Sequence, residues 1–223
     1  MNILINGCSF LSNGHYKTHF KELVNADVVN LAKAGSCNRR IIRTTVDYIE
    51  QHPTVNLVIL GLTFFDRQEI PILKYPKKEE GRWVSYNSRG LQGSFINRND
   101  KLITGTYDQV DDYIQQRYRF DINEFYLDQL YTDLRLLIGY LSSREIGLCV
   151  LNMCDKHHKK VSFGKSVMPL DFIANEFMET SGCRSPDEDK QLPFNARHHF
   201  EDDVLILVEY ILKYIRENDI ARI

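Results

Sequence analysis

The sequence has no apolar run long enough to cross a bilayer, and it carries almost no net charge. Its 223 residues include 28 lysines and arginines against 30 aspartates and glutamates, for a formal net charge of -2. A chain so nearly neutral has no general electrostatic attraction to nucleic acid or to an anionic membrane surface. A membrane-spanning helix needs about 18 or more consecutive apolar residues. We therefore expect neither nucleic acid nor a membrane as a partner.

We also expect neither a secretion signal nor a disulfide framework. The sequence starts on a strand-like run with no basic segment before it, so no signal peptide is visible. The five cysteines are odd in number and irregularly spaced, which favours reduced thiols. The spacing of Cys149, Cys154, His157 and His158 matches no usual zinc site. We expect a cytoplasmic protein with no metal and no organic cofactor.

What the sequence does contain is a repeated unit of short apolar strand, glycine-containing loop and amphipathic helix. Strands are expected at residues 1–6, 27–31, 56–60 and 147–153, and the longest helices at 121–143 and 201–216. Such alternation predicts βαβ crossovers and a parallel sheet. The expected fold is α/β: a three-layer α/β/α sandwich of flavodoxin-like type, with a short, mostly parallel sheet in strand order 2-1-3-4.

The segment 66–120 breaks this rhythm. It contains several prolines and glycines, a charged run at 77–80 and the only tryptophan, Trp83. Short strands are expected within it at 83–86 and 101–104. We interpret the segment as a cap or flap inserted into one domain that spans residues 1–223, because long inserted loops are often functional. A structural flap or a contact within a homo-oligomer is the alternative interpretation.

Small and hydroxylated residues follow the first three predicted strands. Ser9 comes after Gly7 and Cys8 at the end of the first strand, and Thr63 follows the third. In an open parallel sheet, ligands bind outside the carboxyl ends of the strands. Serine is a weak nucleophile alone and needs a base and donors for the oxyanion. The pattern thus raises the question of whether the chain supplies both.

With the strands placed, the residues resemble the SGNH (GDSL-like) hydrolase superfamily, and in particular small SGNH-like proteins encoded by tailed phages. Ser9 stands where that family has its nucleophile, within Gly7-Cys8-Ser9-Phe10. The segment 30–35 looks like the second block, whose glycine, here Gly35, gives a backbone N–H to the oxyanion. Gly61-Leu62-Thr63 falls on the third block. The base is a histidine before the last helix, and His198 has the best register, with His199 as the alternative.

The chain departs from the family pattern at three positions. Cys8 replaces the acidic residue before the serine, which matters little to the mechanism. Thr63 replaces the asparagine that donates to the oxyanion, and Asn38 is an alternative donor. Asn195 stands three residues before His198, where the family has aspartate. An amide oxygen orients imidazole but does not stabilise imidazolium as a charge does. Asp155 or Asp202 in place of Asn195, or a Ser–His dyad, are the alternative arrangements.

The resemblance implies a serine esterase or acyl hydrolase, such as a deacetylase of a small-molecule or carbohydrate ester. Arg67, beside the third strand-end loop, is expected to hold a polar or anionic part of the substrate or to form an ion pair with a neighbouring carboxylate. The alternative function is a catalytically degenerate protein that keeps the SGNH fold for binding or for a structural role.

Overall fold

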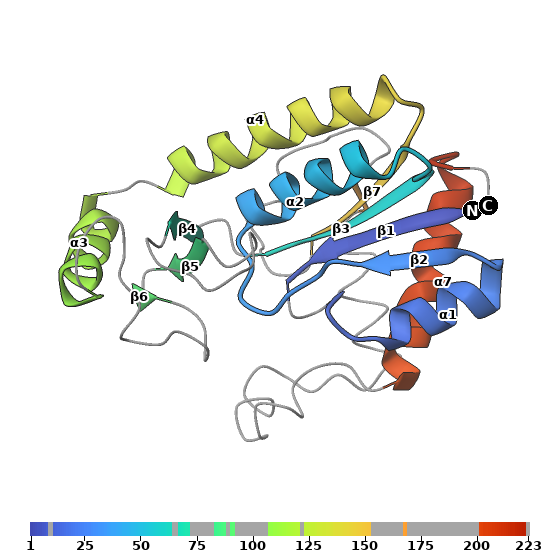
Figure 1. Ribbon diagram of the computed structural model, residues 1–223, viewed down its shortest axis with the longest axis horizontal. Coiled ribbons are helices and arrows are strands. Elements are labelled where there is room, and N and C mark those ends of the chain that lie inside the picture. The colour runs from blue at the N-terminus through green and yellow to red at the C-terminus, as the bar shows by residue number, and fades with distance from the viewer. Residues whose placement is uncertain are drawn as a thin grey trace.

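The computed structural model describes residues 1–8, 11–63, 67–71, 83–87, 90–91, 107–120, 123–152, 167–168 and 201–221. At its centre lies a parallel sheet of five strands in the order β2-β1-β3-β7-β8 (Figure 1). The predicted order of the first four strands is confirmed. The strands are β1 (Asn2–Gly7), β2 (Asp27–Asn30), β3 (Leu57–Leu62), β7 (Gly147–Asn152) and β8 (Val167–Met168).

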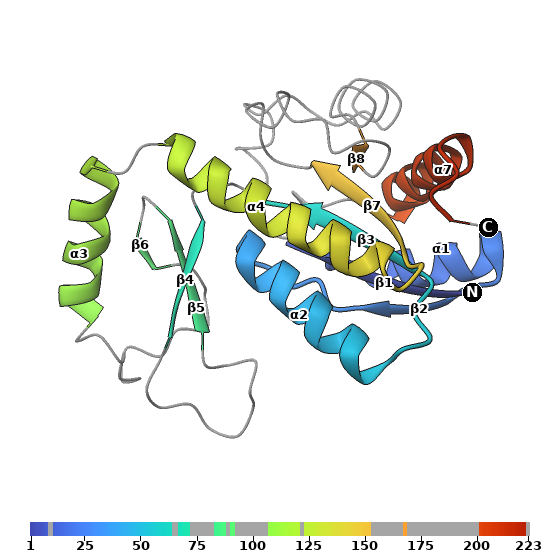
Figure 2. The same cartoon turned by 90° about the horizontal axis from the view of Figure 1, so that it is seen from above.

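Helices cover both faces of this sheet, so the predicted three-layer sandwich is confirmed (Figure 2). Successive strand residues point to opposite faces. In β1, Ile3 and Ile5 pack with α1 (His15–Val24) and α7 (Glu201–Glu217). Leu4, between them, packs on the other face with α2 (Asn38–Gln51) and α4 (Asn123–Ser142). β3 and β7 alternate in the same way, which explains why the strands are almost continuously apolar.

The helices bury the stripes that their spacing predicts, with two corrections. The buried stripes are Leu130, Leu134, Leu137 and Leu141 on α4, and Val204, Leu207, Val208, Ile211 and Ile215 on α7. We expect Phe125 to join the α4 stripe, but its side chain is 48% exposed and Tyr126, four residues before Leu130, takes that place. From its place at the polar start of the first helix we expect His19 to be solvated, but it is buried because α1 packs against α7.

The insertion forms a second, antiparallel sheet of three short strands. These are β4 (Gln68–Pro71), β5 (Trp83–Asn87) and β6 (Gly90–Leu91), and α3 (Tyr107–Phe120) follows them. The strand predicted at 83–86 is confirmed, whereas the one at 101–104 lies outside the described residues. β4–β6 and α3 lie beyond the carboxyl ends of β1 and β3 (Figures 1 and 2). The roles of cap and oligomer contact stay predictions.

An ion pair joins the insertion to the main domain. Arg43 Nη2, on α2, lies 3.1 Å from Glu69 Oε2, on β4, and the Glu69 side chain is only 9% exposed. Because a partly buried pair is screened less than an exposed one, this contact holds β4 against α2. In the part of the chain that the structure describes, no helix is both long and apolar enough to span a membrane.

Candidate active site

The candidate site is built around the carboxyl ends of β1 and β3, together with the chain that follows β2. The main chain after β2 continues alongside β1, where Leu31 N–H donates to Ile5 O (2.8 Å) and Lys33 N–H donates to Gly7 O (3.0 Å). The loop that contains Gly35 is therefore anchored directly beside the strand end that leads into Ser9.

Four of the predicted site residues lie outside the described residues: Ser9, Asn195, His198 and His199. Cys8, directly before Ser9, and Leu11, two residues after it, are described and are held in place. Leu11 N–H donates to Cys8 O (3.2 Å), and Asn30 Nδ2 donates to Leu11 O (2.7 Å). The same Asn30 side chain accepts a hydrogen bond from Ala32 N–H (2.9 Å). Asn30 thus joins the chain after Ser9 to the second loop.

The second loop turns sharply at Gly35, which has a φ of +78°. This left-handed conformation is readily adopted by glycine and costs other L-residues free energy. Ser36 closes the turn by donating from both its N–H (3.1 Å) and its Oγ (2.7 Å) to Lys33 O. Arg40 Nη1 in turn donates to Ser36 Oγ (2.8 Å). The backbone at Gly35 is therefore fixed from both sides.

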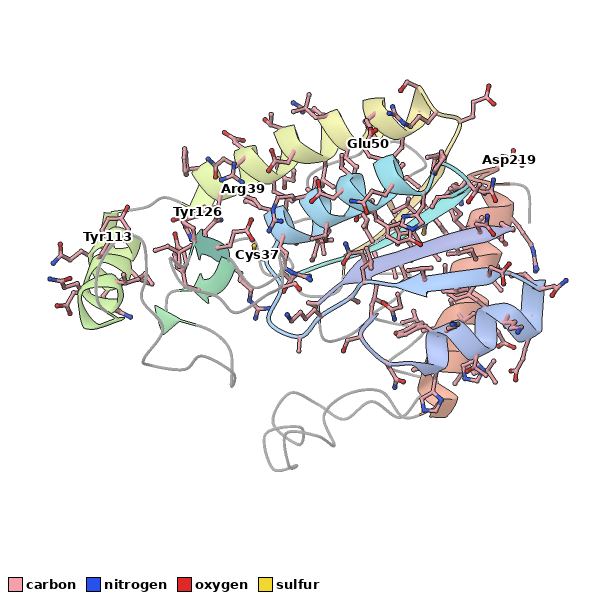
Figure 3. The ribbon with its side chains drawn as sticks, in the orientation of Figure 1. Cys37, Arg39, Glu50, Tyr113, Tyr126 and Asp219 are labelled. Carbon is pink, nitrogen blue, oxygen red and sulfur yellow. The ribbon has the colours of Figure 1, made fainter. Side chains whose placement is uncertain are left out.

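Helix α2 begins directly after this loop. Cys37 is its N-cap, and the Cys37 Sγ accepts a hydrogen bond from Arg40 N–H (3.4 Å). Figure 3 shows Cys37 and Arg39 at this end of the helix, with Glu50 near its other end and Asp219 at the opposite end of the domain. Residues at the start of α2 are thereby placed next to the strand ends.

Asn38, the first residue of α2, is bound to the main chain of Thr63. Its Oδ1 accepts from Thr63 N–H (2.8 Å) and its Nδ2 donates to Thr63 O (3.1 Å). Both residues are buried, with Asn38 4% and Thr63 0% exposed. β1 pairs with β3 only as far as Gly7 and Gly61. The Asn38 amide therefore supplies the hydrogen bonds that a longer β1 would have given to Thr63.

Arg67 connects the second and third loops. Its Nη1 donates to Thr63 Oγ1 (3.1 Å) and to Ser36 O (3.3 Å). The structure thus brings together Asn38, Thr63, Arg67 and the loop of Gly35, all singled out from the sequence. Their roles in binding an oxyanion or a substrate stay predictions.

Sequence reasoning missed Asn6. This residue is fully buried at the end of β1, and its Nδ2 faces three acceptors on α2: Ile41 O (2.9 Å), Thr44 Oγ1 (2.8 Å) and Thr45 Oγ1 (3.0 Å). Its Oδ1 accepts from Gly7 N–H (2.9 Å). A polar side chain in an otherwise apolar strand, three residues before Ser9, was the available signal, because a buried amide needs partners.

The resolved pKa shifts of the described residues do not involve these loops. Burial raises the pKa of the Cys149 thiol, in β7, to about 12. The pKa of Tyr140, near the end of α4, is also raised. Burial is the larger cause, and the hydrogen bond that Tyr140 donates to Glu50 is the second. Within the described ranges, no three side chains of His, Cys, Asp or Glu form a candidate metal site.

Comparison with known proteins gives structural matches alone. No model of a protein family and no curated protein matches the chain. The psychrotrophic esterase EstA from Pseudoalteromonas sp., in a structure inhibited by monoethylphosphonate, is similar at 10% identity, with a TM-score of 0.49 over 97% of each chain. TesA is similar at 10% identity, with a TM-score of 0.47 over 98% of this chain and 99% of its own. The fold class itself rests on the strand order and layers described above.

Proposed function

We propose that the chain is a serine esterase of the SGNH type that acts on a small-molecule or carbohydrate-linked ester with a short acyl group. Ser9 is the nucleophile and His198 the base, with His199 as the alternative. Gly35 N–H and a side chain from the third loop or from α2, Thr63 or Asn38, bind the oxyanion. A cytoplasmic location and kinship with small phage-encoded proteins are part of the same proposal.

The observation that carries this proposal is the link between the second and third loops at the end of β1. Arg67 bridges Thr63 Oγ1 and Ser36 O, and Asn38 holds the Thr63 main chain. The chain leaves β1 for Ser9 beside these loops, where Lys33 N–H is bonded to Gly7 O. Oxyanion stabilisation requires donors that are already held in place before the reaction begins. The hydrogen bonds that fix the second and third loops support the proposal on this point.

In the proposed reaction, the histidine takes the proton of Ser9 as the serine oxygen attacks the ester carbonyl carbon. The negative charge that develops on the carbonyl oxygen is stabilised by the donors of the second and third loops. The histidine then returns the proton to the leaving alcohol, and an acyl-enzyme remains. Water, activated by the same histidine, releases the acid and restores Ser9. Asn195 orients the imidazole through its side-chain oxygen.

A fluorophosphonate probe, which reacts with activated serines, tests this proposal. We expect stoichiometric labelling of the wild-type protein and complete loss of labelling in Ser9→Ala. Loss of labelling in His198→Ala but not in His199→Ala identifies His198 as the base, and the opposite pattern identifies His199. Circular dichroism of each variant shows whether it is folded. Substrate screening with short acyl esters of sugars and small alcohols then follows.

The alternative is a binding protein that has lost catalysis. Asn195 and Thr63 favour it, because each replaces a residue that the resembled family uses in the reaction. A folded wild-type protein that is not labelled by the probe and hydrolyses none of the short acyl esters supports this alternative and contradicts the esterase.

A further inference from the structure

The hydroxyl oxygen of Thr63 accepts a hydrogen bond from Arg67, and within the described residues its own hydrogen is not donated to any acceptor. Thr63 Oγ1 receives a bond from Arg67 Nη1 at 3.1 Å, and the residue is 0% exposed. Among the residues that the structure describes, none accepts the hydroxyl hydrogen of Thr63. A buried donor without an acceptor costs free energy, so each such group calls for an explanation.

The guanidinium restricts where that hydrogen can point. A hydroxyl has one hydrogen and two lone pairs, and a lone pair that accepts from Arg67 turns the hydrogen away from the guanidinium. A bond from a charged donor is stronger than a neutral one and polarises the O–H group, which makes it a better donor in its turn. Thr63 is therefore arranged to donate one strong hydrogen bond.

Two further contacts keep this donor in place. Asn38 fixes the Thr63 main chain through bonds of 2.8 and 3.1 Å. The branched side chain of threonine has few χ1 rotamers, so a fixed backbone also fixes Oγ1. In addition, Arg67 Nη1 donates to Ser36 O (3.3 Å), one residue after Gly35. One guanidinium thus positions both loops that carry the proposed oxyanion donors.

We propose that Arg67 is a positioning residue of the proposed esterase, which orients and polarises the Thr63 hydroxyl so that this hydroxyl donates to the oxyanion. The inference rests on the proposed function and assigns Arg67 a role other than substrate binding. It also explains how threonine serves where the resembled family has asparagine. An amide brings two N–H donors in a fixed plane, whereas a hydroxyl rotates and needs a neighbour to set its direction.

A double-mutant cycle tests this role. The rate constant for fluorophosphonate labelling of Ser9 is measured for the wild type, Thr63→Val, Arg67→Met and the double variant. Thr63→Val keeps the shape and removes the hydroxyl, and we expect a loss of about 10²–10³-fold, the effect of deleting one oxyanion donor. Arg67→Met is expected to slow labelling roughly tenfold in the wild-type background and much less in the Thr63→Val background, because the two groups act as a unit.

The remaining variants separate this role from a structural one. Thr63→Ser keeps the hydroxyl and is expected to restore most of the rate lost in Thr63→Val. Arg39→Met is the matched control: Arg39 lies in the first turn of α2, its Nε is 3.8 Å from Asp133 Oδ2, and its side chain is 59% exposed. It should label at the wild-type rate. The fold of every variant is checked by thermal unfolding.

Each outcome bears on the inference in a defined way. Equal labelling of Thr63→Val and wild type overturns it and leaves Asn38 as the side-chain donor, with the esterase intact. The inference is also overturned if the fold reductions in labelling rate caused by Thr63→Val and Arg67→Met multiply in the double variant. Independent effects combine in this way, whereas two groups that act as a unit do not. Absence of labelling in the wild type overturns the proposed function and, with it, this inference.

Discussion

Gly7 and Gly61 face each other across β1 and β3, at the point where the two strands reach the candidate site. They are the last pair in the register of these strands, and a Cβ placed on Gly7 would lie 3.0 Å from Gly61 O and 3.1 Å from Leu11 Cδ1. The first contact is with main-chain atoms, which cannot turn aside as a side chain can. A side chain at Gly7 would therefore press β1 and β3 apart by a few tenths of an ångström at the strand end that leads into Ser9.

Gly7→Ala is expected to destabilise the protein and to slow the labelling of Ser9. Overpacking of a close contact typically costs about 1–3 kcal/mol, and a shift of β1 would move the segment that follows it. Urea unfolding gives the change in stability and the fluorophosphonate rate gives the effect on the site. If Gly7→Ala is as stable as the wild type, β1 and β3 can shift to accommodate the new Cβ without loss of folding free energy, which contradicts this prediction.

Gly35→Ala and Gly14→Ala form a matched pair, because among the described residues no atom other than those of the adjoining residues lies within 4 Å of a Cβ placed at either position. They differ in backbone conformation, with φ at +78° for Gly35 and -66° for Gly14. Alanine in the left-handed region costs roughly 1–2 kcal/mol, whereas alanine at an ordinary φ stabilises by about 0.4–1 kcal/mol. Opposite signs in the free energy of unfolding are therefore expected.

Asn38→Asp keeps the size of the side chain but changes its hydrogen bonding to Thr63. The new carboxylate still accepts from Thr63 N–H, but its other oxygen faces Thr63 O and has no hydrogen to donate. Leaving a buried acceptor unpaired costs about 1–3 kcal/mol, and more for a charged group. The comparison is Asn2→Asp, which loses a solvent-accessible bond to Thr54 O and should change stability by no more than about 0.5–1 kcal/mol.

The loss in Asn38→Asp should also depend on pH. The protonated carboxyl can donate to Thr63 O, so folding favours the neutral acid and raises the pKa of the new group above its unfolded value. Stability relative to the wild type is then greatest at acid pH and falls as pH rises through the unfolded pKa of about 4. Urea unfolding across the acid range measures this slope. A stability difference between Asn38→Asp and the wild type that does not change with pH would contradict the hydrogen bond to Thr63 O.

Cys149 is expected to be inert in the folded protein. Burial raises its pKa from 9.0 to about 12, so at neutral pH almost no reactive thiolate forms. Iodoacetamide should modify Cys149 only after unfolding, as peptide mass mapping can show. The unfolded thiol ionises at about pH 9 and the folded one at a higher pH, so the free energy of unfolding should decrease as pH rises between these values. Modification of the native protein would contradict this burial.

The fold could be predicted from the sequence where local pattern and packing agree. Strand and helix periods alternated along the chain, and each of the first three strands ended in a small-residue loop, so the order β2-β1-β3-β7 followed. Helix α3 was hidden among the prolines and glycines of the insertion. Its buried residues Val110 and Ile114 are four apart, a weak signal in a polar segment.

The site could be predicted less fully, because its contacts join distant parts of the chain. Residue identity suggested Thr63, Asn38 and Arg67, but the pairing of Asn38 with the Thr63 main chain depends on how α2 packs beside β3. No local pattern encodes a bond between residues 25 positions apart. The same holds for Asn6 and Thr45, which are 39 positions apart.

The buried amide of Asn6 has a consequence for local opening. Its bonds tie the end of β1 to the second turn of α2, while Asn38 ties the first turn of α2 to Thr63. These elements cannot open separately without exposing several unpaired polar groups. The amide protons of Gly7 and Thr63 should therefore exchange with solvent at similar, slow rates. A single cooperative opening would then disrupt the positions of the proposed nucleophile and of the proposed oxyanion donors together.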